Sequence, residues 1–213
     1  MKGLTSQFRA ELVDRVARHL GSGYSARKKD WSIGRQRNGR REHICIGVDG
    51  KWSPMVRIEL FAGIVFPEVS EIQRRAGFVQ QTHHIHVSSS NASHLRGFLY
   101  EGEAEWTVNA SSAIPDVLVD EVAVSAIQLG KGLFSRFRDI RDVRNAIAAN
   151  DPWITASNWE DVLALDLALD EFDHFYQWVQ NDKYLAENPS DVQTAIHRVV
   201  ETFRELESVR WYA

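Results

Sequence analysis

The stretch WSIGRQRNGRREHICI, residues 31–46, predicts a β-hairpin and with it the start of an antiparallel sheet. Asn38-Gly39 is the strongest short turn signal in the chain, because both residue types tolerate the positive φ angles of a two-residue type I′ turn. Such a turn fixes the register of the two strands. The predicted pairs are Ile33 with Ile44, Arg35 with Glu42, Arg37 with Arg40, and Trp31 with Ile46. Apolar residues thus face apolar residues and a basic residue faces an acid, which supports the hairpin.

The segments on either side of this hairpin extend the fold. Apolar residues at helical spacing from Leu4 to Leu20 predict an N-terminal helix, with glycines after it as a stop signal. A strand is expected at 55–62, after a register shift of one residue near Pro54 that keeps its apolar side chains on the face of the preceding strand. Pro67 then predicts the start of a short helix that ends near Ala76.

Two further strand signals follow. The alternation in HHIHVS, residues 83–88, predicts a strand with Ile85 and Val87 on one face and His84 and His86 on the other. The run 95–109 predicts another hairpin with its turn at Glu101-Gly102.

From Pro115 onward the pattern is helical. Helices are expected at roughly 115–130, 139–149, 158–186 and 191–209. The fold class is therefore α+β, with an N-terminal helix, an antiparallel meander of about five to six strands and a C-terminal layer of about four helices. We expect a single domain over 1–213, in which the helix and sheet of 1–112 carry the helical layer of 113–213.

Composition limits the classes of protein to consider. The chain has 213 residues, a formal net charge of −4 and ordinary apolar and charged fractions, as folded globular proteins do. No stretch approaches the roughly 18 consecutive apolar residues of a membrane-spanning helix, so no membrane role is expected and a cytoplasmic location is predicted. Cys45 is the only cysteine, which excludes an intramolecular disulfide and any cysteine-rich zinc site.

One candidate site is a divalent metal centre on the polar face of the sheet. His84 and His86 lie two residues apart on a strand, so their imidazoles can meet at one ion, and Glu103 or Glu105 could supply a carboxylate. A His/Glu face that senses pH or binds a partner, and ordinary polar surface, are the alternatives. No nucleophile or general base accompanies the histidines, so the sequence favours a non-enzyme without a cofactor over a metal-dependent hydrolase.

A second candidate is an acidic stripe. Asp166, Asp170 and Asp173 fall on one side of the predicted long helix, past the first turn where the helix dipole favours acids. Because like charges at this spacing repel, replacing all three by Asn should leave thermal stability equal or higher. The stripe predicts a basic protein partner or self-association, with Trp153 in the preceding linker as an aromatic anchor.

The third candidate is the basic hairpin. Residues 26–42 carry seven basic residues against two acids. Its candidate binding residues are Arg35, Arg37, Arg40 and Arg41, and a basic β-ribbon over 27–41 could bind nucleic acid. The net negative charge and a pI near 6.1 argue against this, as does the use of Arg35 within the sheet.

Four segments resemble an uncharacterised family of small bacterial proteins known only as a domain of unknown function. They are LGSGYSARKKDW, IGRQRNGRREHICIGV, MVRIELFAGI and GLFSRFRDIRDVRNAI, and the similarity covers about the first two thirds of the chain. The resemblance implies an accessory or interaction protein and transfers no site residues. With the acidic stripe, it favours a non-catalytic protein-binding protein of accessory or immunity type.

Overall fold

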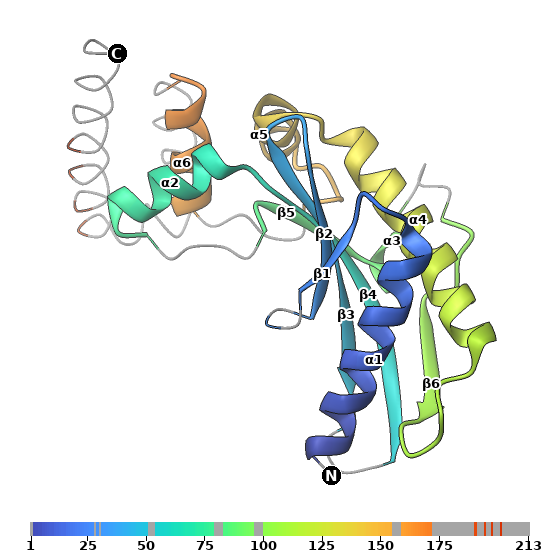
Figure 1. The fold of residues 1–213 in the computed structure, drawn as a ribbon. Helices are drawn as coiled ribbons and strands as arrows, with labels where there is room; N and C mark the ends of the chain where they lie inside the picture. The colour runs from blue at the N-terminus through green and yellow to red at the C-terminus, as the bar shows by residue number, and fades with distance from the viewer. Residues whose placement is uncertain are drawn as a thin grey trace. The chain divides into compact units, whose positions relative to one another are not determined.

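A computed structural model describes residues 2–27, 29, 31–50, 54–78, 83–95, 100–154 and 159–171, together with Ser190, Thr194, His197 and Glu201. The described chain is α+β, with an N-terminal helix, an antiparallel sheet and C-terminal helices (Figure 1). The elements are α1 (Lys2–Leu20), β1 (Ser25–Arg27), β2 (Ser32–Arg37), β3 (Arg40–Asp49), β4 (Met55–Val65), α2 (Pro67–Ala76), β5 (Ile85–Ser88), α3 (Ser89–His94), β6 (Glu105–Asn109), α4 (Asp116–Arg136), α5 (Ile140–Ala148) and α6 (Trp159–Ala168).

The chain divides into two compact units, where the sequence predicted one domain. The first unit comprises 1–64, 85–138 and 152–155, and the second comprises 65–84, 139–151 and 156–213. Helix α4 belongs to the same unit as the sheet, whereas α5 and α6 belong to the second unit. No helix among the described residues is both long and apolar enough to cross a bilayer.

The hairpin formed by β2 and β3 has the predicted register. Ile33 pairs with Ile44, and Arg35 pairs with Glu42. Asn38 and Gly39 form the turn with φ angles of 51° and 74°, as a type I′ turn requires. The backbone N–H of Ile46 donates to the carbonyl of Trp31 at 3.2 Å, so the pairing continues to the predicted end.

The core of the first unit lies between the sheet and two helices. In Figure 1, α1 and α4 lie side by side, and both contact β3. The buried apolar side chains of α1 are Phe8, Leu12, Val13 and Val16; those of α4 include Val119, Val122, Leu129 and Leu133. They cover the buried sheet residues Ile33, Ile44, Ile46, Val56, Ile58 and Leu60. Removal of this apolar surface from water is the main force that holds the helices on the sheet.

The edge of the sheet differs from the prediction. Strand β4 is longer than expected and pairs with two strands in succession, Phe61 to Ile64 with β5 and Met55 to Glu59 with β6. Residues 100–104 form no strand, so the predicted hairpin at Glu101-Gly102 is wrong over its described part; residues 96–99 lie outside the described residues. Strand β4 has 11 residues and is therefore long enough to pair with both β5 and β6. Turn signals in the local sequence do not reveal this pairing.

The second unit is helical in its described part. Helix α2 begins at Pro67 and ends before Gly77, as the sequence predicted. Helix α6 packs against both α2 and α5. It ends at Ala168, so the predicted continuous helix over 158–186 is wrong at 169–171. The rest of that predicted helix, and almost all of the helix predicted over 191–209, lie outside the described residues.

Gly50 occupies a backbone conformation that other residues avoid. Its φ is 144°, and a Cβ atom placed there would lie 2.8 Å from the Met55 carbonyl oxygen and 2.9 Å from Val56 Cγ1. Gly50→Ala is therefore expected to lower the free energy of unfolding by about 1–3 kcal/mol in chemical denaturation. Gly23→Ala is the matched control, because Gly23 has ordinary φ and open space around it. Equal stability of the two variants would contradict this explanation.

Candidate functional site

A basic pocket lies at the end of the β2–β3 hairpin. Helix α1 stops at Leu20 while α4 continues to Arg136, and the space left over the hairpin forms a cavity of about 600 Å³. Three parts of the first unit supply its cations. Strand β2 supplies Arg35 and Arg37, and the first residue of β3 supplies Arg40. The last turns of α4 supply Lys131, and Arg138 follows that helix. Its volume is in the range of pockets that bind small ligands.

A buried carboxylate fixes two of the arginines that line this pocket. Glu42 is fully buried and accepts hydrogen bonds from Arg35 Nε at 2.7 Å and Arg40 Nε at 3.0 Å. Arg40 also donates to the carbonyl oxygens of Phe137 and, at 2.7 Å, Phe134, at the C-terminal end of α4. A guanidinium is well placed there, because unpaired carbonyls make the C-terminal end of a helix electronegative. Arg40 is thereby fixed as a structural bridge between the hairpin and α4.

Two aromatic rings lie near the guanidinium of Arg35. Its guanidinium carbon lies 4.6 Å from the centroid of the Tyr24 ring and 6.0 Å from that of Phe134. Burial raises the pKa of Tyr24, although Arg35 acts in the opposite direction. The phenol therefore stays protonated at neutral pH and can donate a hydrogen bond inside the pocket.

The rim of the pocket carries the available positive charge. Arg37 and Lys131 are exposed, and neither makes an ion pair with a described residue. Arg138 is also exposed, and its Nε donates to the Ser135 carbonyl at 3.2 Å. Glu42 pairs with Arg35 and Arg40, while Arg37 and Lys131 add two charges that make no ion pair with a described residue, so the pocket keeps an excess of positive charge. Arginine and lysine in such a pocket suit a carboxylate or a phosphate group.

Three of the four arginines singled out in the sequence thus come together. Arg41 lies on β3 opposite Gln36 and does not line the pocket. Sequence reasoning missed Lys131 and Arg138, although the segment KGLFSRFR, residues 131–138, is itself basic. The segment lies between two predicted helices and otherwise contributes only to the family resemblance, so the sequence does not connect its charge with the hairpin.

Asp166 does not belong to an exposed acidic stripe. Its side chain is fully buried in the second unit and is paired with Arg144 of α5. Arg144 Nε donates to one carboxylate oxygen, and Nη2 lies 3.3 Å from the other. The expectation that Asp166 repels its neighbours on a solvated face is therefore wrong, because a basic residue from a different helix neutralises it.

Asp170 ends α6. It adopts a φ of 57°, its N–H donates to the Leu167 carbonyl at 3.3 Å, and the Glu171 N–H donates to the Asp166 carbonyl at 2.9 Å. These two bonds form a Schellman cap with an aspartate in the left-handed position that glycine usually takes. Asp170 is exposed, and Asp173 lies outside the described residues.

Trp153 is not an exposed anchor. The residue is only 4% exposed, and its ring packs edge-on against Phe137 with centroids 6.3 Å apart. The Arg136 guanidinium covers the ring at 5.2 Å. The turn around Pro152 folds this side chain into the core of the first unit, so Trp153 contributes to packing.

His84 lies just before the start of β5 and belongs to the second unit. Its ring stacks on Phe66, and the Phe66 backbone N–H donates to Nδ1 at 2.9 Å. Nδ1 therefore carries no proton, and the neutral ring carries its proton on Nε2. Nε2 lies 3.3 Å from Gln73 Oε1 and 3.5 Å from Ser70 Oγ. Because Nε2 is already protonated, it cannot act as a general base for the Ser70 hydroxyl.

The other proposed metal ligands lie elsewhere. His86 is on β5 opposite Gly63, Glu103 is exposed in the segment before β6, and Glu105 lies 3.5 Å from Arg57 in an ion pair. Among the described residues, no group of three or more His, Cys, Asp and Glu side chains is arranged to hold a metal ion. The geometry gives the metal hypothesis no support.

His86 gives a pH-dependent prediction. Burial lowers its pKa below the ordinary value of 6.5, so the folded state binds a proton more weakly than the unfolded state. The stability from the neutral ring is complete above pH 6.5 and is lost as the pH falls through the lower folded-state pKa. Thermal denaturation between about pH 7.5 and 5 should show a steeper loss for the wild type than for His86→Gln. Parallel profiles would exclude His86 as the cause.

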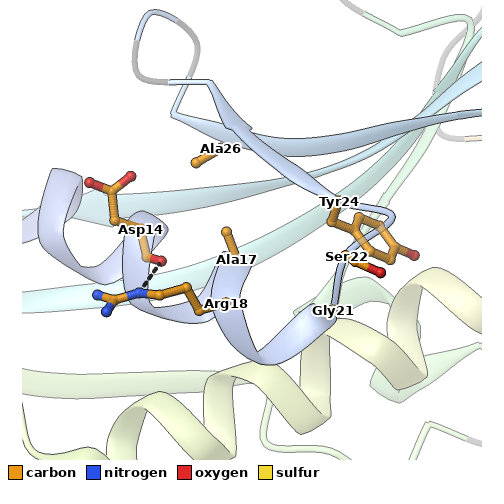
Figure 2. Close-up of a pocket in the computed structure, with 7 residues that line it drawn as sticks. All are labelled: Asp14, Ala17, Arg18, Gly21, Ser22, Tyr24 and Ala26. Carbon is orange, nitrogen blue, oxygen red and sulfur yellow. Dashed lines mark hydrogen bonds between the residues drawn. The ribbon is translucent and has the colours of Figure 1, made fainter.

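A second hollow of about 580 Å³ lies between α1 and β1 (Figure 2). Asp14, Ala17 and Arg18 line it from the helix and Ala26 from the strand, and Arg18 Nε donates to the Asp14 carbonyl at 3.2 Å. Tyr24 lines both this groove and the basic pocket. The groove contains one acid and one base, so it carries no charge preference, and the basic pocket is the stronger candidate site.

Comparisons of the chain with protein-family models, with curated proteins and with solved structures find no match. The resemblance to the uncharacterised bacterial family stays a prediction.

Proposed function

We propose that this chain is a non-catalytic binding protein of accessory or immunity type, which receives an acidic group of a protein partner in the basic pocket. The observation that carries the proposal is the gathering of five cations around one cavity, two of which, Arg37 and Lys131, make no ion pair with a described residue. Arg35 and Arg40 are fixed by Glu42, so their positive charge is held in place before any ligand arrives. A site ordered in advance loses little entropy on binding.

The class of partner follows from the positive charge of this pocket. The acidic stripe predicts a basic partner, but Asp166 of that stripe is buried and cannot contact a partner. The exposed cations Arg37, Lys131 and Arg138 fit an acidic partner, whose carboxylates they would steer and orient. The rim residue Ile127 is 48% exposed and offers an apolar contact beside the charges.

Nucleic acid is the second candidate, because the same cations could contact phosphates. A duplex or single strand needs a track of basic groups along the surface, whereas these cations converge on a cavity. The chain also has a net charge of −4, which opposes general phosphate affinity. We propose the cytoplasm as the compartment, where a protein with Cys45 as its only cysteine needs no disulfide.

Binding of labelled probes tests the proposal. A fluorescent oligoglutamate peptide and a DNA oligonucleotide would be titrated with the protein at one ionic strength, and their dissociation constants compared. We expect the peptide to bind, and Arg37→Gln with Lys131→Gln to weaken it by about tenfold or more. The matched control is Arg27→Gln with Arg41→Gln, which removes two charges from the same sheet region outside the pocket.

The outcomes separate the candidates. If DNA binds more tightly than the peptide, and both pairs of substitutions weaken it equally, the proposal is wrong and the basic residues form a nucleic-acid surface. Absence of binding to either probe would overturn the pocket as a site for anions.

A further inference from the structure

Helix α4 exposes apolar side chains on the face that points away from the sheet. The described residues include four exposed large hydrophobic side chains, and three of them belong to α4: Val117 at 63%, Val124 at 53% and Ile127 at 48% exposure. The opposite face of α4 is buried through Val119, Val122 and the residues that follow them. The helix thus has a second apolar face, which no described element covers.

The spacing of this face is that of a helix-packing seam. Val117, Asp120, Val124, Ile127, Lys131 and Phe134 follow one another at alternating intervals of three and four residues. A seam of this period packs along a second helix, with side chains of the two helices in successive layers. All of these residues are exposed except Phe134, which is buried at the end of the seam.

The seam is complementary to itself when it is read in opposite directions. In an antiparallel pair that places Val124 of one helix beside Ile127 of the other, the same symmetry places Asp120 beside Lys131, whereas Phe134 at the level of Val117 is buried in its own subunit. Each layer occurs twice, once on either side of the two-fold axis. Two apolar layers therefore lie at the centre, with an opposite-charge pair on either side.

We infer that α4 is the interface of a homodimer, in which two copies of this chain pack their α4 helices antiparallel. The charges along the seam favour a second copy of this chain as the partner. Asp120 and Lys131 would repel their own kind in a parallel pair, where like residues meet, and attract in the antiparallel pair. Such an interface is isologous and closes at two subunits, so it forms no chain of further copies.

The groups that already surround the seam are compatible with this arrangement. Asp120 Oδ1 lies 2.9 Å from His19 Nε2 of α1, and its exposed carboxylate can accept from a second donor. Lys131 is exposed and makes no ion pair with a described residue. A single helix pair is a small contact surface, so we expect a dimer that dissociates on dilution in the micromolar range.

The inference can be tested separately from ligand binding in the basic pocket. Ile127 and Lys131 take part in both surfaces, but Val124 lies outside the pocket. Sedimentation of the full chain over a range of concentrations should show a monomer–dimer equilibrium. Val124→Glu should weaken dimerisation by about tenfold or more, because it places a charge in each central layer. Asn145→Glu, an exposed helical site on α5, is the control for an added charge.

A charge exchange makes the test specific for the antiparallel pair. Asp120→Lys alone and Lys131→Asp alone should each weaken the dimer, and the double variant should restore it to within about threefold of the wild type. Far-ultraviolet circular dichroism would verify that every variant is folded. A chain that stays monomeric at all concentrations would overturn the inference. So would a dimer that Val124→Glu leaves unchanged, or one that the double variant fails to restore.

Discussion

Asp166→Ala is expected to lower the free energy of unfolding of the second unit by about 3–5 kcal/mol. The carboxylate is fully buried, and it is the partner of Arg144, which is itself only 5% exposed. Removal of one member of a buried pair leaves the other charge without compensation in a medium that solvates it poorly. Chemical denaturation followed by tryptophan fluorescence would measure the loss.

Two variants test the cause of that loss. Asp170→Asn changes an exposed acid at the end of the same helix, and Asn tolerates the left-handed backbone there, so its effect should be small. Asp166→Leu with Arg144→Met removes both charges and should recover much of the stability. A loss below about 1 kcal/mol for Asp166→Ala would show that the buried pair is not an important contact.

The second large effect is expected for Glu42→Ala in the first unit. Glu42 is fully buried and holds both Arg35 and Arg40, the latter only 5% exposed. Its removal leaves Arg40 buried without a carboxylate, so the free energy of unfolding should fall by about 3–5 kcal/mol. Urea denaturation would measure this, with Glu103→Ala as the exposed control. Equal stability of these two variants would contradict the bridging role of Glu42.

Local signals predicted the local structure well. The turn at Asn38-Gly39 fixed the hairpin register, and Pro67 and Gly77 bounded α2, because each signal acts through the backbone conformation of the residue itself. The pairing of Arg35 with Glu42 followed from that register, so part of the candidate pocket could be predicted.

Contacts between distant segments could not be predicted in the same way. Arg40 meets the end of α4 across about a hundred residues of sequence, and Asp166 meets a basic residue on a different helix. Periodicity shows that a helix has faces, but it does not show which other element covers each face. For the same reason, β6 was paired with a neighbouring segment instead of β4.

Two local errors had a different origin. Helix α6 ends in a left-handed aspartate, a position where glycine or asparagine is the usual signal. His84 was assigned to a strand by its alternation with Ile85, yet its ring is held by the Phe66 backbone N–H. In both places a specific hydrogen bond determined the conformation, and the residue pattern alone did not contain it.

The position of anion binding is the central claim, and nuclear magnetic resonance tests it most directly. Backbone amide signals of the full chain would be followed while the oligoglutamate peptide is added. The basic pocket predicts that the largest shifts occur at Leu20, Asn38 and Ser135, which line it from three different segments, and that Thr107 on β6 does not move. Shifts at Asp14 and Ala17 of the neighbouring groove without these three, or no shifts in the first unit at all, would contradict the claim.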